Sequence, residues 1–171
     1  NPKQVKQWAE ATYGKIKGHA LPDRKPQRDP EQEGTRRVEV RAPAENPYVI
    51  VGFKAPRLEN VDKDTDPYAL AVLSAVLDGY PGARLGREMV QGSQIATQAG
   101  ASYDMTGRGP SLFYLDATPS QGKTVADMEA ALIAQVKKVA EEGITEAELG
   151  RVKSQLVASQ VYKRDSLFGQ A

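Results

Sequence analysis

The sequence predicts an α+β fold, a mainly antiparallel sheet with helices packed on one face. Pairs of short runs with strand-like alternation are separated by pairs of longer runs with helical periodicity. The predicted order is helix, strand, strand, helix, short helix, strand, strand, helix, helix, and this order favours a sheet covered on one side. The 171 residues, 40% apolar and 26% charged, are sufficient for one domain with a core of its own.

The first helix is predicted at the very start of the chain. Asn1 suits the N-cap and Pro2 the first helical position. Val5, Trp8 and the following Ala9, Thr12 and Tyr13 fall on one helical face, and Gly14 is placed to end the helix. Because organised structure begins so abruptly, we expect residues 1–171 to form a single domain that is a fragment of a longer chain.

Residues 18–34 are predicted to be an extended, proline-rich linker on the surface. They contain three prolines, many charges and few apolar positions. His19 stands at the start of this segment, and no residue of metal-ligand type lies at a useful spacing from it. We therefore interpret His19 as a solvated loop residue.

Two strands are predicted next, at 36–43 and 48–56. The first alternates, with Arg37, Glu39 and Arg41 on one face, and is expected to be half solvated. The second carries the apolar run 49–51 followed by Phe53, and is expected to be the central strand of the sheet.

A strongly apolar helix is predicted from Asp66, with Pro67 at its first position. Its apolar residues cover most of its circumference, so we expect it to be deeply buried. The stretch that follows, 79–104, joins a Gly-Tyr-Pro-Gly turn to a short charged helix and then to an alternating run that ends in Tyr103. A short helix that leads directly into a strand can position particular side chains.

A further strand is predicted within 109–120, joined to the preceding one by a glycine-containing hairpin turn. An amphipathic helix over 123–143 and a second helix from residue 145 complete the chain. Thr145 and Glu148 have the spacing of a capping box, in which each residue's side chain accepts a bond from the other's backbone N–H.

Composition excludes several kinds of chemistry. The chain has no cysteine, which excludes disulfides and thiolate sites, and His19 is its one histidine, too few for a catalytic zinc site. A net charge of +1, with no basic face, argues against a nucleic-acid partner. No apolar run approaches the roughly 20 residues of a membrane-spanning helix.

Two local motifs have simpler structural interpretations. Ser120 and Lys123 have the spacing of Ser–Lys acyl enzymes, but no supporting motif accompanies them and the serine suits a helix start. The acidic residues around 141–148 flank two helix ends, where a solvated surface is expected. We therefore predict no self-sufficient active site and no metal site in this chain.

The order and spacing of five segments resemble the second, non-zinc domain of pitrilysin/insulinase-type metallopeptidases. These segments are VKQWAEATYGKI, the proline-rich linker, RRVEVRAPAENPYVIVGFKAP, DPYALAVLSAVLDGYPGARLGREMV and ITEAELGRVKSQLVASQVYKRDSLFGQA. The resemblance covers essentially the whole chain. It implies a fold like that of the processing peptidases and LuxS, with the inverted zinc motif His-x-x-Glu-His in a separate upstream domain.

The resemblance also concerns the short helix and the strand after it. In the family, this element often supplies an Arg and a Tyr, seven residues apart, to a facing zinc site: the Arg binds a substrate carbonyl or carboxylate, and the Tyr donates to the oxyanion. Alignment places Val90 at the arginine position and Thr97 at the tyrosine position. Neither side chain can perform these roles, and Arg87 and Tyr103 lie nearby at the wrong offsets.

Two functions are consistent with the absence of the family's Arg and Tyr at positions 90 and 97, and both are implied by the resemblance. The parent protein is either a zinc peptidase in which this domain forms part of a peptide-holding chamber and docks a paralogous partner, or a non-catalytic structural subunit like the core proteins of the bc1 complex. In the first case the partners are a peptide substrate and a second subunit, in a homo- or heterodimer. A binding module that grips peptides at a sheet edge is a third class. By analogy with other members of the family, we expect the protein to be located in the bacterial periplasm.

Overall fold

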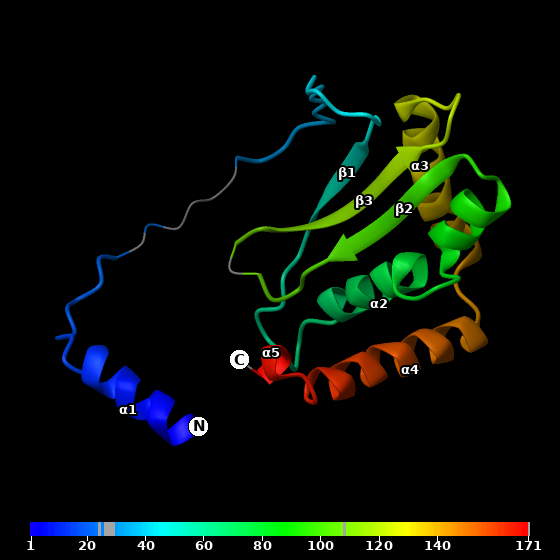
Figure 1. The fold of residues 1–171 in the computed structure, drawn as a ribbon. Coiled ribbons are helices and arrows are strands. Elements are labelled where there is room, and N and C mark those ends of the chain that lie inside the picture. Colours follow the sequence, from blue (N-terminus) through cyan, green and yellow to red (C-terminus); the bar gives the residue numbers. More distant parts are fainter. Residues whose placement is uncertain (24, 26–29, 108, 171) are drawn as a thin grey trace.

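The computed structural model describes residues 1–23, 25, 30–107 and 109–170. Its elements follow one another along the chain in an order close to the predicted one (Figure 1). They are α1 (Pro2–Thr12), β1 (Val49–Ala55), α2 (Asp66–Asp78), the π-helix η1 (Gly86–Gly92), β2 (Ala96–Tyr103), β3 (Ser111–Pro119), α3 (Val125–Glu142), α4 (Glu146–Lys163) and α5 (Leu167–Gln170).

The described strands form one antiparallel sheet in the order β1-β3-β2, which confirms the predicted fold class. The expectation that β1 is the central strand is wrong, because β3 pairs with both of its neighbours and β1 lies at an edge. The apolar run 49–51 suggested burial on both faces. In the structure Val49 and Val51 face the core, whereas the side chain of Ile50 is 58% exposed on the opposite face.

Helices cover one face of the sheet, as the alternation of β3 shows. Phe113, Leu115 and Ala117 are buried against the helices, and the residues between them point to the other face. Leu77 of α2 and Leu132 of α3 enter the same cluster, so both helices pack on the same face. In Figure 1 α3 lies behind the sheet, and the uncovered face, called here the open face, is turned to the viewer.

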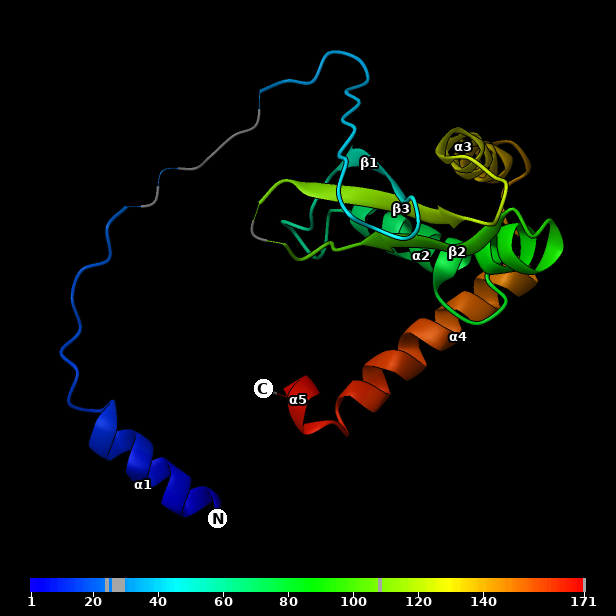
Figure 2. The same cartoon turned by 45° about the horizontal axis from the view of Figure 1, so that its top comes forward.

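A second, smaller cluster joins α2 to α4. Val76 of α2 and Val152 of α4 are both fully buried in it. The helix α2 is therefore enclosed from two sides, by β2 and by α4, as its apolar circumference predicted, although Tyr68 at its start is 40% exposed. The C-terminal half of α4 diverges from α2 and leads to α5 (Figure 2).

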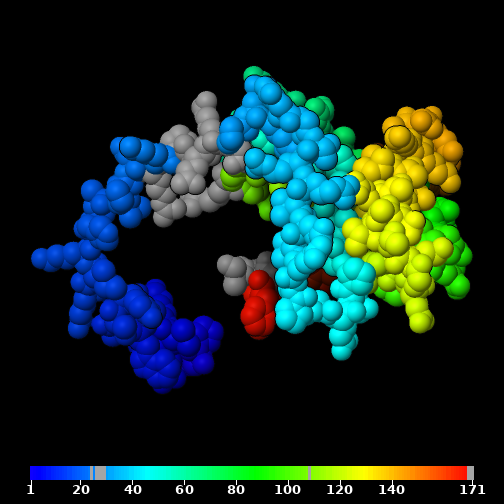
Figure 3. Space-filling model, turned by 90° about the horizontal axis from the view of Figure 1, so that it is seen from above, coloured from blue at the N-terminus to red at the C-terminus, as the bar shows by residue number. Residues whose placement is uncertain are grey.

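The N-terminal segment lies away from the sheet. Asn1 caps α1, its side-chain oxygen accepting a bond of 3.1 Å from the Lys3 backbone N–H, and no residue of α1 is buried. Figure 3 shows α1 as a separate arm beside the rest of the molecule. The described residues of the predicted linker, 18–34, contain no helix or strand, while residues 24 and 26–29 of that segment lie outside the described part.

The prediction of a strand at 36–43 is wrong for this structure. Residues 35–42 belong to no helix or strand, no ladder joins them to a described strand, and Val38 and Val40 are 75% and 81% exposed. The alternation identifies a segment able to form a strand. A strand also needs a neighbour, and here Arg37 makes an ion pair with Glu129 of α3 while the backbone remains unpaired.

Candidate functional site

The candidate site is the junction where η1 leads into β2, the segment that the sequence singled out. Leu85 and Met89 are fully buried and fix the helix to the core. The predicted short helix is present, but it is a π-helix: the backbone N–H of Ser93 donates to the carbonyl of Glu88, five residues back, at 2.9 Å. Single-turn π-helices of this kind occur frequently at functional sites.

Two further irregularities of the backbone follow within a few residues. Gln94 has a φ of 53°, the one positive value among the described non-glycine residues. The register of β2 against β3 then shifts between Ala96 and Gln98, so Thr97 sits in a β-bulge and its hydroxyl donates to the Thr118 carbonyl at 3.3 Å. A bulge changes the direction of a side chain on an otherwise regular strand. The junction is therefore a locally defined turn rather than a plain helix-to-strand connection.

An ion pair between helices fixes the start of the junction. Arg84, just before η1, donates to Glu148 of α4 through Nε at 2.8 Å and through Nη2 at 2.6 Å, and also donates to the Gly143 carbonyl at 3.0 Å. Both side chains are nearly buried. The guanidinium holds the pKa of Glu148 below its ordinary value, and the carboxylate raises the pKa of Arg84.

This pair corrects one detail of the predicted capping box. The backbone N–H of Glu148 does donate to the Thr145 hydroxyl at 3.2 Å, as predicted, but the Glu148 carboxylate binds Arg84 instead of the Thr145 backbone. A complete capping box occurs at α3, between Thr124 and Asp127. The sequence pattern gave no sign that Arg84 would compete for this carboxylate.

The structure places the two predicted site residues in different environments. Val90 is half buried and packs against the core, whereas Thr97 is exposed. The two nearby residues that could have replaced the missing pair are already engaged. Arg87 pairs with Glu88, and Tyr103 donates its hydroxyl to the Pro56 carbonyl and stacks on Phe113 with 6.1 Å between ring centroids.

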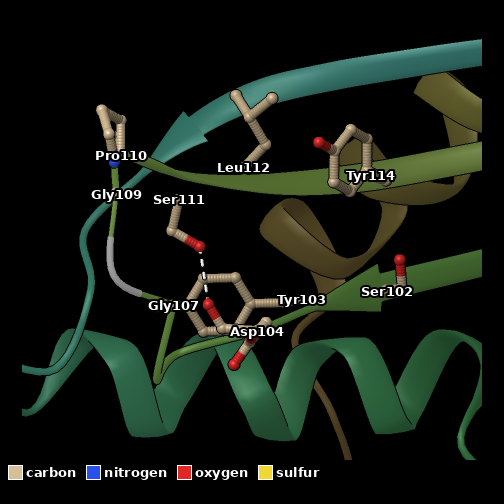
Figure 4. Close-up of a pocket in the computed structure, with 9 residues that line it drawn as sticks. All are labelled: Ser102, Tyr103, Asp104, Gly107, Gly109, Pro110, Ser111, Leu112 and Tyr114. Atoms are coloured by element: carbon tan, nitrogen blue, oxygen red, sulfur yellow. Dashed lines mark hydrogen bonds between the residues drawn. The ribbon is translucent and has the colours of Figure 1, made fainter. Parts of the chain in front are cut away.

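The open face of the sheet carries a shallow pocket at the β2–β3 hairpin end (Figure 4). Its volume is about 330 Å³. Ser111 closes one side, its hydroxyl donating to the Asp104 carbonyl at 2.6 Å, and Tyr114 lies on the face of the central strand, 39% exposed. The sequence did not single out Ser102 or Tyr114, because the alternation of a strand does not show which of its faces lacks a covering layer.

A pair of carboxylates lies farther along the open face, around Gly100 of β2. A Cβ at this glycine would stand 2.8 Å from an oxygen of Asp116 and 3.2 Å from an oxygen of Asp78. Partial burial, with a smaller contribution from Asp116, raises the pKa of Asp78, although a bond from the Ala101 N–H acts in the opposite direction. Burial and a hydrogen bond to Asp116 raise the pKa of Tyr48.

Metal-ligand residues do not converge in the described part of the chain. No group of three or more His, Cys, Asp or Glu side chains there could hold a metal ion, and His19 is exposed in the linker. No described helix is both long enough and apolar enough to cross a membrane.

Comparisons with known proteins agree with this description. The profile of the family described as "Peptidase M16 inactive domain" matches residues 1–156. Among solved structures, a protease from Helicobacter pylori has a similar fold, with a TM-score of 0.81 at 22% sequence identity over 99% of this chain. The chain spans 40% of the length of that protease chain. A search of curated proteins finds no match.

Proposed function

Because the chain belongs to the family of peptidase M16 inactive domains, we propose that it is the non-catalytic domain of a zinc metallopeptidase. In this role it forms one wall of a chamber that holds an extended peptide and provides a surface for a partner subunit. The observation that carries the proposal is the family match, which extends over 1–156 and includes the η1–β2 junction.

The donor groups of this chain do not fit a zinc site. Catalytic zinc takes nitrogen, sulfur and carboxylate ligands, usually including two or three histidines, and this chain has one histidine and no cysteine. We therefore assign the zinc to the upstream domain of the parent protein. No step of the hydrolysis is assigned to residues of this chain.

The open face of the sheet supports the chamber role. Ile50 and Tyr114 are exposed on it at 58% and 39%, beside the hairpin pocket. Gly52 leaves room next to the Tyr114 ring, whose nearest atoms lie 3.8 Å from the position of a Cβ. An extended peptide could lie across such a face through apolar contacts with these two side chains. At the η1–β2 junction, Val90 and Thr97 leave this wall without the arginine and tyrosine that act on a facing zinc site.

The peptide-holding role can be tested with two tyrosine variants of the chain. We expect Tyr114→Ser to weaken the binding of a fluorescent, unstructured peptide, measured by anisotropy. Tyr162→Ser removes a tyrosine that is 71% exposed on α4 and should leave binding unchanged. Equal binding by both variants and by the unaltered chain would exclude the open face as the peptide surface.

The zinc content of the full-length parent separates the two functions that the family allows. About one zinc ion per chain is expected for a catalytic parent, and the partner that supplies the Arg and Tyr groups would then be sought in a homo- or heterodimer. Absence of zinc after purification without chelator would contradict the proposal and identify the parent as a structural subunit.

A further inference from the structure

The two edges of the sheet differ in whether their backbone groups are satisfied. At the β2 edge, the Ala101 N–H donates to the Asp78 carboxylate at 3.3 Å, and the Ser74 hydroxyl donates to the Ala101 carbonyl at 3.2 Å. Just beyond the strand, the Leu58 N–H donates to the Met105 carbonyl at 2.8 Å. Side chains of α2 and the backbone of the loop after β1 thus bond to groups that another strand would have to pair with. The β2 edge is therefore closed to an added strand.

The β1 edge is open. β1 pairs with β3 along its whole length, and its outward backbone groups make no hydrogen bond to any described residue. A free edge of this kind is a template for an added strand. In the described part of the chain, Lys54 is the one charged residue on β1, and its ammonium donates to the Pro30 carbonyl at 3.1 Å.

The segment just before β1 has the composition of the missing neighbour. Residues 37–41 alternate between charged and β-branched side chains, and residues 36–41 too lack backbone hydrogen bonds to described residues. Contacts with Lys54 and Glu129 hold Pro30 and Arg37 near β1 and α3. In Figure 2 this segment enters β1 from the side of the sheet away from α2. An unpaired edge and an unpaired strand-forming segment therefore lie next to each other in the sequence and in space.

We propose that residues 36–41 add to the outer edge of β1 as a fourth, antiparallel strand, with residues 42–47 as the turn. Pro43 and Pro47 end the two strands at this turn, where their missing N–H groups cost no ladder bond. The added strand closes the edge against peptides and other sheets. This inference does not depend on the proposed function, because it rests on the sheet alone.

The side-chain pattern selects one register. Val49 and Val51 of β1 face the core, so Val38 and Val40 must face the same side to be buried. Pairing Arg41 with Tyr48 achieves this, whereas a slip of one residue would turn both valines to the open face. The resulting pairs are Arg41–Tyr48, Val40–Val49, Glu39–Ile50, Val38–Val51 and Arg37–Gly52.

The ion pair between Arg37 and Glu129 opposes this movement. In the proposed register Arg37 lies opposite Gly52, on the open face, so it must leave α3 as the strand forms. The two side chains are 67% and 31% exposed, and an exposed pair of this kind is weak and screened by salt. When residues 36–41 add to β1, this ion pair is lost and Val38 and Val40 become buried. We therefore expect Arg37→Ala or high salt to favour the added strand.

Engineered cysteines test the register directly, because the chain has no cysteine of its own. Glu39→Cys with Ile50→Cys places the two thiols opposite each other in the proposed register. Val40→Cys with Ile50→Cys is the matched control, in which the thiols lie on opposite faces of the added strand. We expect the first pair to oxidise at least about tenfold faster, because disulfides require closely apposed β-carbons.

Hydrogen exchange of the unaltered chain provides a second measurement that needs no substitution. Strand addition predicts slowed exchange for alternate backbone amides of 36–41, with a further slowing in Arg37→Ala. Equal oxidation rates for the two cysteine pairs, or exchange of these amides at the rate of an unstructured peptide in both chains, would overturn the proposal.

Discussion

Arg84 and Glu148 form a bidentate ion pair that joins the start of η1 to the first turn of α4. The two residues are 64 positions apart in the sequence. Their ion pair links the segment that leads into the η1–β2 junction to α4, the helix that packs on α2. Because Arg84 also binds the Gly143 carbonyl, one guanidinium connects the junction to the loop between α3 and α4. The geometry of the candidate site therefore depends on a helix outside the sheet layer.

Removal of the Glu148 carboxylate should destabilise the chain substantially. Glu148→Ala leaves the nearly buried guanidinium of Arg84 without its partner, and breaking a buried pair in this way costs about 3 kcal/mol. Urea denaturation measures the loss. Glu146→Ala, an exposed position in the same first helical turn, is the control and should change the free energy of unfolding by less than about 0.5 kcal/mol.

The same pair predicts a dependence of stability on pH. Arg84 lowers the pKa of Glu148 in the folded chain below its ordinary value of 4.5, so the folded state binds fewer protons than the unfolded state in this range. The stabilisation is therefore fully present above about pH 4.5 and is lost as the pH falls through the folded-state pKa. Glu148→Gln should flatten the acid side of the stability curve. An unchanged slope between pH 5 and 3 would contradict this assignment.

The sequence predicted most elements of the fold because their patterns are local. Helix caps such as Asn1 and Thr145, the alternation of 111–119 and the turn at 79–82 all depend on neighbours within a few residues. Edge and central positions depend on pairing between distant segments. For that reason the sequence could not show that β1 lies at the edge or that 36–43 lacks a partner in this structure.

The candidate site was predicted less well, for a similar reason. The sequence correctly located a short helix leading into a strand, but the π-helical hydrogen bonds, the positive φ of Gln94 and the bulge at Thr97 have no simple sequence signature. The ion pair between Arg84 and Glu148 and the proximity of Asp78 to Asp116 arise from tertiary packing. Whether Val90 and Thr97 mark a former substrate contact remains a prediction.

Two glycines should respond to the same substitution in opposite ways. A Cβ at Gly79 would stand 2.5 Å from the Ala75 Cα and 2.7 Å from its carbonyl oxygen, both backbone atoms that cannot move alone. We expect Gly79→Ala to lower the free energy of unfolding by about 2 kcal/mol. At Gly150, inside α4, a Cβ would meet nothing within 4 Å, so Gly150→Ala should stabilise the chain by about 1 kcal/mol through its helix propensity. Thermal unfolding of both variants checks these two predictions. A loss of stability in Gly150→Ala would show that this face of α4 is covered.

Restoring the family's side chains at the junction should affect Val90 and Thr97 differently. Thr97 is exposed in the bulge and makes one long hydroxyl bond, so Thr97→Tyr should change the free energy of unfolding by less than about 0.5 kcal/mol. Val90 packs against the core, and Val90→Arg loses that packing, although a long arginine stem can retain part of it. We expect a cost of about 1 kcal/mol.

The double variant tests whether the two sites are independent. If Val90 and Thr97 share no contact, the two effects add, and the double variant loses only about 1 kcal/mol. Urea denaturation of the four chains gives the coupling directly. A loss well above the sum of the single variants would show that the junction cannot accommodate both side chains, and the loss of the Arg/Tyr pair would then have a structural basis in the packing of η1 against β2.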